Sequence, residues 1–236
     1  MLQALRSLIC KNVFPPDLDP GVVAIIRRVR PFTMTSPERV GAFIAAIDYV
    51  IAAELDGAIV ECGVWRGGSM MAAALRLLQS DFRPELYLFD TYEGMPQPSP
   101  VDVDLRGRPA QKRFARSRTP AGSRWCLAGI DEVRRNLEST GYPMDRVHFV
   151  KGMVETTIPA EAPEQIAILR LDTDWYESTK HELAHLYPRV TPRGVLIIDD
   201  YGYWKGSRRA VDEFLANRPL LVNRIDITGR LIMKTD

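Results

Sequence analysis

Two apolar runs in the second half of the chain end abruptly in carboxylates. Residues 168–171 and residues 195–198 have the length and composition of buried strands, and two aspartates follow each run. Acids at the C-terminal ends of buried parallel strands are typical of open α/β sheets, which bind their ligands at that edge. The four carboxylates belong to Asp172, Asp174, Asp199 and Asp200.

The segment between these runs predicts that the two acidic tips are neighbours. Ser178 to Tyr187 reads as a helix and Pro188–Gly194 as its turn back, so the whole is a βαβ unit. Four clustered carboxylates repel one another strongly unless protons or a cation intervene. A hard divalent metal ion meets this need, and the alternative is that the aspartates only cap helices and turns.

A strand, a glycine turn and a second strand come earlier in the chain. Ala58–Gly63 predicts the first strand, and Val64–Ser69 its turn into a helix that ends near Gln79. The turn lets a ligand approach the backbone, although the dinucleotide fingerprint G-x-G-x-x-G is absent. The second strand, Leu86–Asp90, ends in an acid of the kind that accepts hydrogen bonds from ribose hydroxyls. Together they indicate a cofactor that contains adenosine, with a purely structural arrangement as the alternative.

An N-terminal segment precedes this pattern. Val22–Val29 predicts a short helix, and Ser36 predicts the N-cap of a longer helix that starts with Pro37 and runs to about Leu55. We expect residues 1–36 to form a cap segment beside the sheet and residues 37–236 to form the main domain. Two roles fit this cap segment: it buries a flank of the sheet, or it closes over the site.

The regular pattern stops between Thr91 and about Pro120, which is typical of a functional lid or a disordered loop. A solvated charge run is the favoured interpretation of its basic residues; an anion-steering mouth or an RNA-binding patch is the alternative, although Phe114 is its only aromatic residue for stacking on a base. The basic residues are Arg106, Arg108, Lys112, Arg113, Arg116 and Arg118.

The pattern resumes with a helix over Ala128–Leu137 and a third strand over Arg146–Val150. We expect His148, inside that strand, to be a packed or edge histidine and not a catalyst. The segment that follows, from Lys151 to Thr157, leaves the strand at the same sheet edge as the acids.

Composition narrows the class of protein. The 236 residues suffice for one full α/β domain, and 46% hydrophobic with 26% charged residues is ordinary for a soluble globular protein. A net charge of +1 gives no general attraction to nucleic acid or membrane, and no run approaches the length of a membrane span or a signal peptide, so we expect a cytoplasmic protein. Cys10, Cys62 and Cys126 have no metal-binding spacing and predict neither a disulfide framework nor a zinc site.

Four motifs in fixed order carry a resemblance to a known family. They are ECGVWRGGS at 61–69, FDTYEGMP at 89–96, LDTDWYEST at 171–179 and IDDYG at 198–202. Together they resemble the macrocin O-methyltransferase family, the sugar methyltransferases of antibiotic biosynthesis, over roughly Thr33 to Lys234.

The resemblance implies an α/β protein with the class I methyltransferase (Rossmann-like) fold, a doubly wound, mostly parallel sheet with an N-terminal helical cap. It also implies S-adenosylmethionine, Mg²⁺ and methylation of a sugar hydroxyl in a glycosylated natural product. By position, Asp172, Asp199 and Asp200 match the metal ligands, and Asp174 matches the general base. The residues implied to bind the cofactor are Met34, Glu61, Gly63, Ser69, Asp90, Gly152 and Val154.

Two other functions remain open at this point. A metal-dependent glycosyltransferase also uses Asp-x-Asp, as in Asp172-Thr173-Asp174, but that function leaves Glu61 and Asp90 unexplained. A non-catalytic binding module on the same fold is the second. We expect a small-molecule glycosylated partner, without nucleic acid or membrane; a homo-oligomer is compatible with the apolar N-terminal segment.

Overall fold

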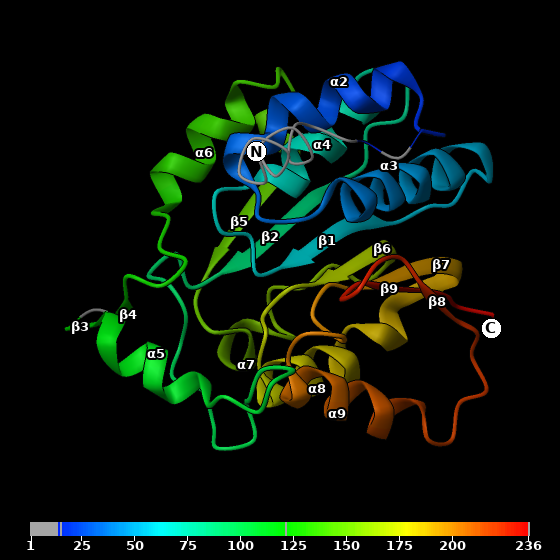
Figure 1. Ribbon diagram of the computed structural model, residues 1–236. Coiled ribbons are helices and arrows are strands. Elements are labelled where there is room, and N and C mark those ends of the chain that lie inside the picture. The colour runs from blue at the N-terminus through cyan, green and yellow to red at the C-terminus, as the bar shows by residue number, and fades with distance from the viewer. Residues whose placement is uncertain (1–13, 15, 121, 236) are drawn as a thin grey trace, which may run out of the picture.

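A seven-stranded sheet runs through the middle of the molecule (Figure 1). The computed structural model describes residues 14, 16–120 and 122–235. All neighbouring strands are parallel except β9, which is antiparallel to both of its neighbours. This order confirms the doubly wound, mostly parallel α/β sheet. From edge to edge the strands are β5 (Val147–Lys151), β2 (Leu86–Asp90), β1 (Ala58–Cys62), β6 (Ile166–Leu171), β7 (Val190–Ile198), β9 (Arg230–Met233) and β8 (Val222–Arg224).

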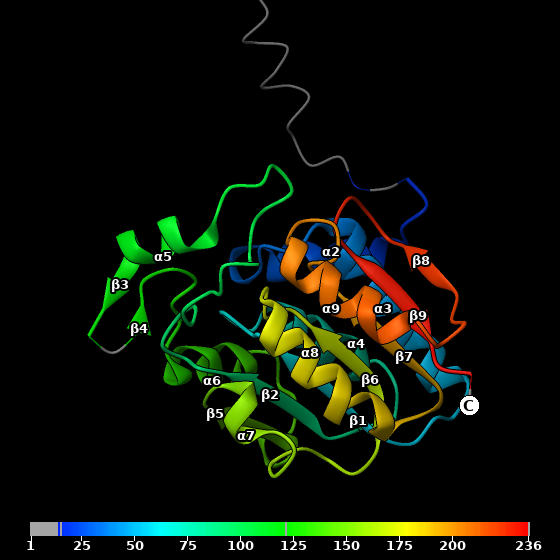
Figure 2. The ribbon, with the colours of Figure 1, turned by 90° about the horizontal axis from the view of Figure 1, so that it is seen from below.

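Helices cover both faces of the sheet (Figures 1 and 2). Each face buries its own apolar cluster against the sheet, so the molecule has three layers. On one face lie α2 (Pro20–Val29), η1 (Arg30–Phe32), α3 (Pro37–Ala52), α4 (Gly68–Leu77) and α6 (Ile130–Glu138), with η2 (Met144–Arg146) leading into β5; on the other lie α7 (Val154–Thr157), α8 (Tyr176–His185), η3 (Tyr187–Arg189) and α9 (Lys205–Leu215).

The central strands are buried along their whole length. Every residue of β1 and β6 is buried, because helices cover both faces of these strands. Two charged residues break the apolar sequence, Glu61 in β1 and Arg170 in β6, and the register places them side by side. Their side chains form an ion pair of 2.5 Å inside the sheet, through one of the two carboxylate oxygens of Glu61.

The longer N-terminal helix begins as the sequence predicts, whereas α2 begins at Pro20 instead of the predicted Val22. The Ser36 hydroxyl accepts a hydrogen bond from the backbone N–H of Arg39 (3.2 Å), and Pro37 is the first residue of α3. Ser36 is therefore confirmed as the N-cap of this helix. The apolar face of α2 belongs to the same buried cluster as β1. The boundary between a cap segment and the main domain at residue 36 stays a prediction. The first 13 residues of that segment, which include Cys10, lie outside the described residues.

One predicted turn is wrong in its second half. Pro192 and Gly194 suggested a turn up to residue 194, yet β7 already begins at Val190. The backbone N–H of Arg193 donates to the carbonyl oxygen of Lys234, and the N–H of Lys234 donates to that of Gly194, both at 2.9 Å. Hydrogen bonds to the far end of the chain therefore hold these residues in the sheet, although Arg193 itself has a positive φ of 67°.

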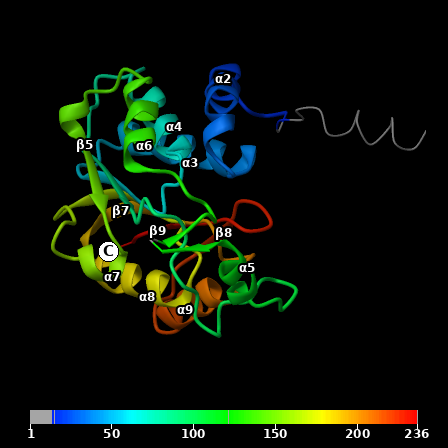
Figure 3. The same cartoon turned by 90° about the vertical axis from the view of Figure 1, so that its left-hand side faces the viewer.

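The segment between Thr91 and Trp125 stands at the edge of the sheet where β1 and β2 end (Figures 1 and 3). It contains α5 (Ala110–Ser117) and a short hairpin of β3 (Arg118–Thr119) and β4 (Gly122–Ser123). The Asp102 carboxylate accepts a hydrogen bond from the first N–H of α8 (2.8 Å), and the first N–H of α9 donates to the carbonyl of Val103 (2.9 Å). The segment is thus fastened to two helices rather than loose, and its predicted role as a lid stays a prediction.

Within the described part of the chain, none of the helices combines the length and the apolar character that a membrane crossing requires.

The close packing of the first glycine turn gives a stability test. Gly63 has φ +83°, and a Cβ there would overlap the backbone oxygen of Asp172. We expect Gly63→Ala to lower the free energy of unfolding by more than about 2 kcal/mol, measured in urea. Gly129→Ala is the matched control, because nothing lies within 4 Å of a Cβ at Gly129. Equal stability of the two variants would contradict the observed approach of β1 to β6.

Candidate active site

A cavity of about 360 Å³ opens at the carboxyl edge of the sheet. All eleven site residues that the sequence proposed line it, although they come from segments far apart along the chain. The cavity is therefore the place where the predicted cofactor and metal residues meet. These residues are Met34, Glu61, Gly63, Ser69, Asp90, Gly152, Val154, Asp172, Asp174, Asp199 and Asp200.

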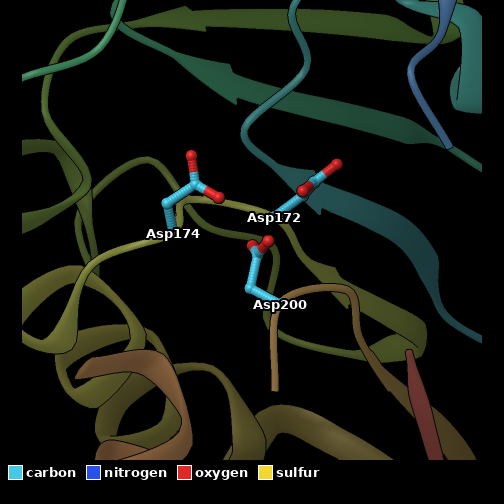
Figure 4. Close-up of side chains that lie close together, drawn as sticks. All are labelled: Asp172, Asp174 and Asp200. Atoms are coloured by element: carbon cyan, nitrogen blue, oxygen red, sulfur yellow. The ribbon is translucent and has the colours of Figure 1, made fainter. Parts of the chain in front are cut away.

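Three of the aspartates form one cluster. Asp172 and Asp174 follow β6, Asp200 follows β7, and one carboxylate oxygen from each lies within 4.8 Å of the others (Figure 4). Mg²⁺ prefers oxygen ligands, carboxylates above all, so the chemistry of this donor set fits the ion that the sequence predicts.

Asp199 lies apart from this cluster. One of its carboxylate oxygens accepts a hydrogen bond from Arg170 and the other from Arg39, whose Nε also donates to Asp226 (3.0 Å). The structure therefore groups Asp174, and not Asp199, with Asp172 and Asp200. Each oxygen of Asp199 keeps a second lone pair, so its predicted role as a metal ligand stays a prediction.

Arg170 connects the strand tips, and the sequence reasoning did not single it out. Its side chain is buried, and its Nη1 donates both to Glu61 (2.5 Å) and to Asp172 (2.8 Å). An arginine inside an apolar strand was the available signal, because a buried guanidinium requires acidic partners. The second missed arginine, Arg39, reaches the site from α3.

Two of the three clustered carboxyl groups, those of Asp174 and Asp200, have raised pKa values. Desolvation raises the pKa of Asp174 to about 7, and a hydrogen bond with Asp200 partly offsets this. Burial, followed by the charges of Asp174 and Asp172, raises the pKa of Asp200 well above its usual range. Asp174 also has φ +70°, a left-handed conformation that Asp tolerates better than most residues and that turns it away from the strand.

Glu61 presents an unsatisfied charge at another wall of the cavity. Burial raises its pKa to about 8, although Arg170 acts in the opposite direction. Its second carboxylate oxygen, Oε2, is buried and has no hydrogen-bond partner among the residues that the structure describes. A buried carboxylate oxygen without a donor fits a ligand that brings positive charge, as a sulfonium cofactor with an amino group does.

Asp90 fastens the glycine turn to the end of β2. Its Oδ2 accepts hydrogen bonds from the backbone N–H groups of Val64 (2.7 Å) and Trp65 (3.0 Å), and its Oδ1 accepts one from Tyr92 (2.8 Å). Trp65 and Tyr92 both have positive φ, so these bonds hold a strained backbone. The predicted contact with a ribose stays a prediction, and replacing Asp90 would loosen the turn as well.

Trp125 and Trp204 line another wall of the cavity, and Trp175, which is not a lining residue, packs against both of them. The ring centroids of Trp125, Trp175 and Trp204 lie 5.0 to 6.0 Å apart, and the guanidinium of Arg113 lies 4.2 Å from the Trp125 centroid. Sequence reasoning missed this wall because its residues are widely separated along the chain. His148 takes no part in the cavity: it stacks on Tyr87 and contacts Glu85 (2.7 Å), as expected of an edge histidine.

Comparison with known proteins decides the family. The family model "Macrocin-O-methyltransferase (TylF)" matches residues 28–234. The chain belongs to the macrocin O-methyltransferase family. This confirms the resemblance that the four motifs carried, and the chain is an O-methyltransferase.

Several known methyltransferases resemble the chain over most of its length. The tetracenomycin-C 4'-O-methyltransferase of Streptomyces olivaceus, whose full name specifies a 2,3-dimethoxy-α-L-rhamnosyl group, is 32% identical over 218 residues, 91% of this chain and 80% of that protein. The solved O-methyltransferase NovP is 30% identical with a TM-score of 0.74, covering 87% of this chain and 83% of NovP. The methyltransferase PaMTH1 of Podospora anserina, solved with S-adenosylhomocysteine, shares the fold at a TM-score of 0.57 and 16% identity, over 100% and 96% of the two chains.

The raised pKa of Glu61 predicts a pH dependence of stability. A carboxyl whose pKa rises from 4.5 to about 8 on folding stabilises the protein below pH 4.5, and this contribution is lost as pH rises through 8. We expect the free energy of unfolding of the unliganded protein to fall between pH 6 and pH 9. Glu61→Gln should remove part of that slope, at most about 1.4 kcal/mol per pH unit for one proton.

Urea unfolding at a series of pH values measures this slope. Glu138→Gln, at an exposed position of α6, should leave the slope as in the unmutated protein. The slope that persists in Glu61→Gln belongs to the other buried acids with raised pKa values, among them Asp174, Asp200 and Glu182. Identical slopes in Glu61→Gln and the unmutated protein would contradict the account of Glu61.

Proposed function

We propose that the protein transfers a methyl group from S-adenosylmethionine to a sugar hydroxyl, with Mg²⁺, in the biosynthesis of a glycosylated natural product. The observation that carries the proposal is the cluster of Asp172, Asp174 and Asp200 in the same cavity as the unpaired Oε2 of Glu61. One part of the cavity suits a divalent cation and another suits a cationic cofactor. Membership of the macrocin O-methyltransferase family supports the same reaction.

The cofactor would lie along the turn after β1. Glu61 would offset its positive charge, Gly63 and Ser69 would contact it through the turn, and Asp90 would keep the turn in shape. When bound, S-adenosylmethionine supplies the methyl group, whose bond to sulfur breaks, with its electron pair passing to sulfur, as the acceptor oxygen forms the new bond to carbon. The remaining cofactor-binding residues of the proposal are Met34, Gly152 and Val154, which line the cavity as well.

The metal would lie between the tips of β6 and β7. Asp172 and Asp200 are ligands in this proposal, and Asp199 is the third, through the lone pairs that its two arginine partners leave free. When bound, Mg²⁺ lowers the pKa of an acceptor hydroxyl and orients it.

Asp174 receives the hydroxyl proton in this proposal. It lies in the cavity beside Asp172 and Asp200, and in the described part of the chain it has no guanidinium or ammonium within ion-pair distance. A proton leaving the acceptor oxygen would pass to a carboxylate oxygen of Asp174 as the new carbon–oxygen bond forms. The tryptophan wall would keep water from competing for the methyl group.

The variant Asp174→Asn tests whether Asp174 is the general base or a metal ligand. It keeps the shape of the side chain and removes its basic oxygen, so we expect unchanged affinity for Mg²⁺ and a loss of about 10²- to 10⁴-fold in kcat. Asp172→Asn is the comparison variant and should lose both metal affinity and turnover. Lost metal affinity in Asp174→Asn would make Asp174 a ligand, and near-normal turnover would place proton removal elsewhere.

Ligand-induced thermal shifts test the reaction class. We expect S-adenosylmethionine to raise the melting temperature of the protein, because a ligand that binds only the folded state stabilises it, while UDP-glucose with Mg²⁺ leaves it unchanged. EDTA should abolish methyl transfer to a sugar acceptor, and added Mg²⁺ should restore it. A shift with UDP-glucose alone would favour a glycosyltransferase.

A further inference from the structure

The chain concentrates positive charge in one short segment. Between Leu105 and Ile130 it has seven Lys and Arg residues and no Asp or Glu, whereas the whole chain has a net charge of only +1. The rest of the protein is therefore net negative. This segment forms α5 and the β3–β4 hairpin.

These cations are not neutralised by the protein. All seven are exposed, and across the described residues only Arg108 pairs with a carboxylate, that of Asp104 (2.6 Å). The neighbouring Asp102 is buried and accepts hydrogen bonds from Ser99 and Tyr176, so it faces away from the basic residues. The segment thus presents uncompensated positive charge to solvent.

The basic segment is held beside the cavity. Trp125, which follows the hairpin, packs against Trp175 and Trp204 at the starts of α8 and α9. Arg113 of α5 stacks on Trp125, and both side chains line the cavity together with the clustered aspartates. Figure 3 shows α5 and the hairpin at this edge of the molecule.

The cavity lining consequently carries charges of both signs: the clustered aspartates and, on the rim formed by α5, Arg113 of the basic segment. The acids have a cation and a proton to hold, as proposed above. In the described part of the chain Arg113 has no carboxylate within ion-pair distance, and a neutral glycoside would bring no anion to it. Arginine binds phosphate through paired hydrogen bonds, and a cleft lined by one sign of charge attracts ligands of the other sign.

We infer that the acceptor is a sugar that carries a phosphate or diphosphate group, with the phosphate at Arg113 and the neighbouring cations of α5. This inference rests on the proposed function, because it names the class of sugar that the methyltransferase takes. The sugar would lie against the aromatic wall, between the phosphate at the rim and the acceptor hydroxyl at Asp174. Sugar phosphates and nucleoside diphosphate sugars share this chemistry. Methylation would then precede the glycosyl transfer that breaks the sugar–phosphate bond.

Three acceptors test the inference. Thymidine diphosphate rhamnose, rhamnose 1-phosphate and the neutral methyl rhamnoside are titrated by calorimetry into protein with S-adenosylhomocysteine and excess Mg²⁺, then compared in turnover with S-adenosylmethionine. We expect at least one phosphate-bearing sugar to bind and react at least about tenfold better than methyl rhamnoside, with an affinity that falls as KCl rises. Comparison of the two phosphate-bearing sugars shows whether the nucleoside is required.

Substitution of Arg113 tests whether the preference for phosphate-bearing sugars depends on this side chain. Arg113→Gln should raise KM for the phosphate-bearing sugar about 10- to 100-fold, the range for a lost hydrogen bond to a charged group, and should change kcat little. For methyl rhamnoside, KM and kcat should both stay the same. Arg113→Lys should restore part of the affinity, because it keeps the charge. Arg135→Gln removes an exposed charge from α6 and should change nothing.

The outcomes separate this inference from the proposed function. Methyl rhamnoside binding as tightly as the phosphate-bearing sugars, or Arg113→Gln weakening all three acceptors equally, would overturn the inference. Failure of all three to bind would overturn it as well. Tight, Arg113-dependent binding of a phosphate-bearing sugar without methyl transfer would support the inference and count against the proposed function instead.

Discussion

The rest of the site depends on one buried guanidinium, that of Arg170 in β6. It lies between Glu61 of β1, Asp172 at the end of its own strand and Asp199 after β7, and it donates to all three. Breaking a buried ion pair costs several kcal/mol because the remaining charge stays unpaired, so Arg170 holds three adjacent strand tips together and in register. Figure 4 shows the space beside these tips in which the other aspartates meet.

Arginines neutralise only part of the acid at this edge. Arg170 and Arg39 pair with Glu61, Asp172 and Asp199, while no arginine of the described residues forms an ion pair with Asp174 or Asp200. Burial first, and then the charge of neighbouring aspartates, raises the pKa values of Asp174 and Asp200. The Oε2 of Glu61 is a further buried carboxylate oxygen without a donor among the described residues. A cavity of this kind favours cationic ligands, and both a sulfonium cofactor and Mg²⁺ belong to that class.

Much of this arrangement could be predicted because it follows from the order of residues along single strands. Leu86–Asp90 forms β2 with the predicted bounds, and the acids after β6 and β7 meet because parallel strands end at one edge. The separation of Asp199 from Asp174 could not be predicted, because it depends on Arg39, which lies 160 residues away. The cluster of Trp125, Trp175 and Trp204 likewise could not be predicted, because it forms only when the segment after β2 packs on the starts of α8 and α9.

Titration calorimetry of Mg²⁺ into the protein without cofactor or acceptor tests the central claim, that excess carboxylate at the strand tips forms a cation site. The account predicts one saturable Mg²⁺ site per chain and none in Asp200→Asn, whose fold is checked by circular dichroism. Saturable binding that survives in Asp200→Asn, or no saturable binding in the unmutated protein, would contradict it.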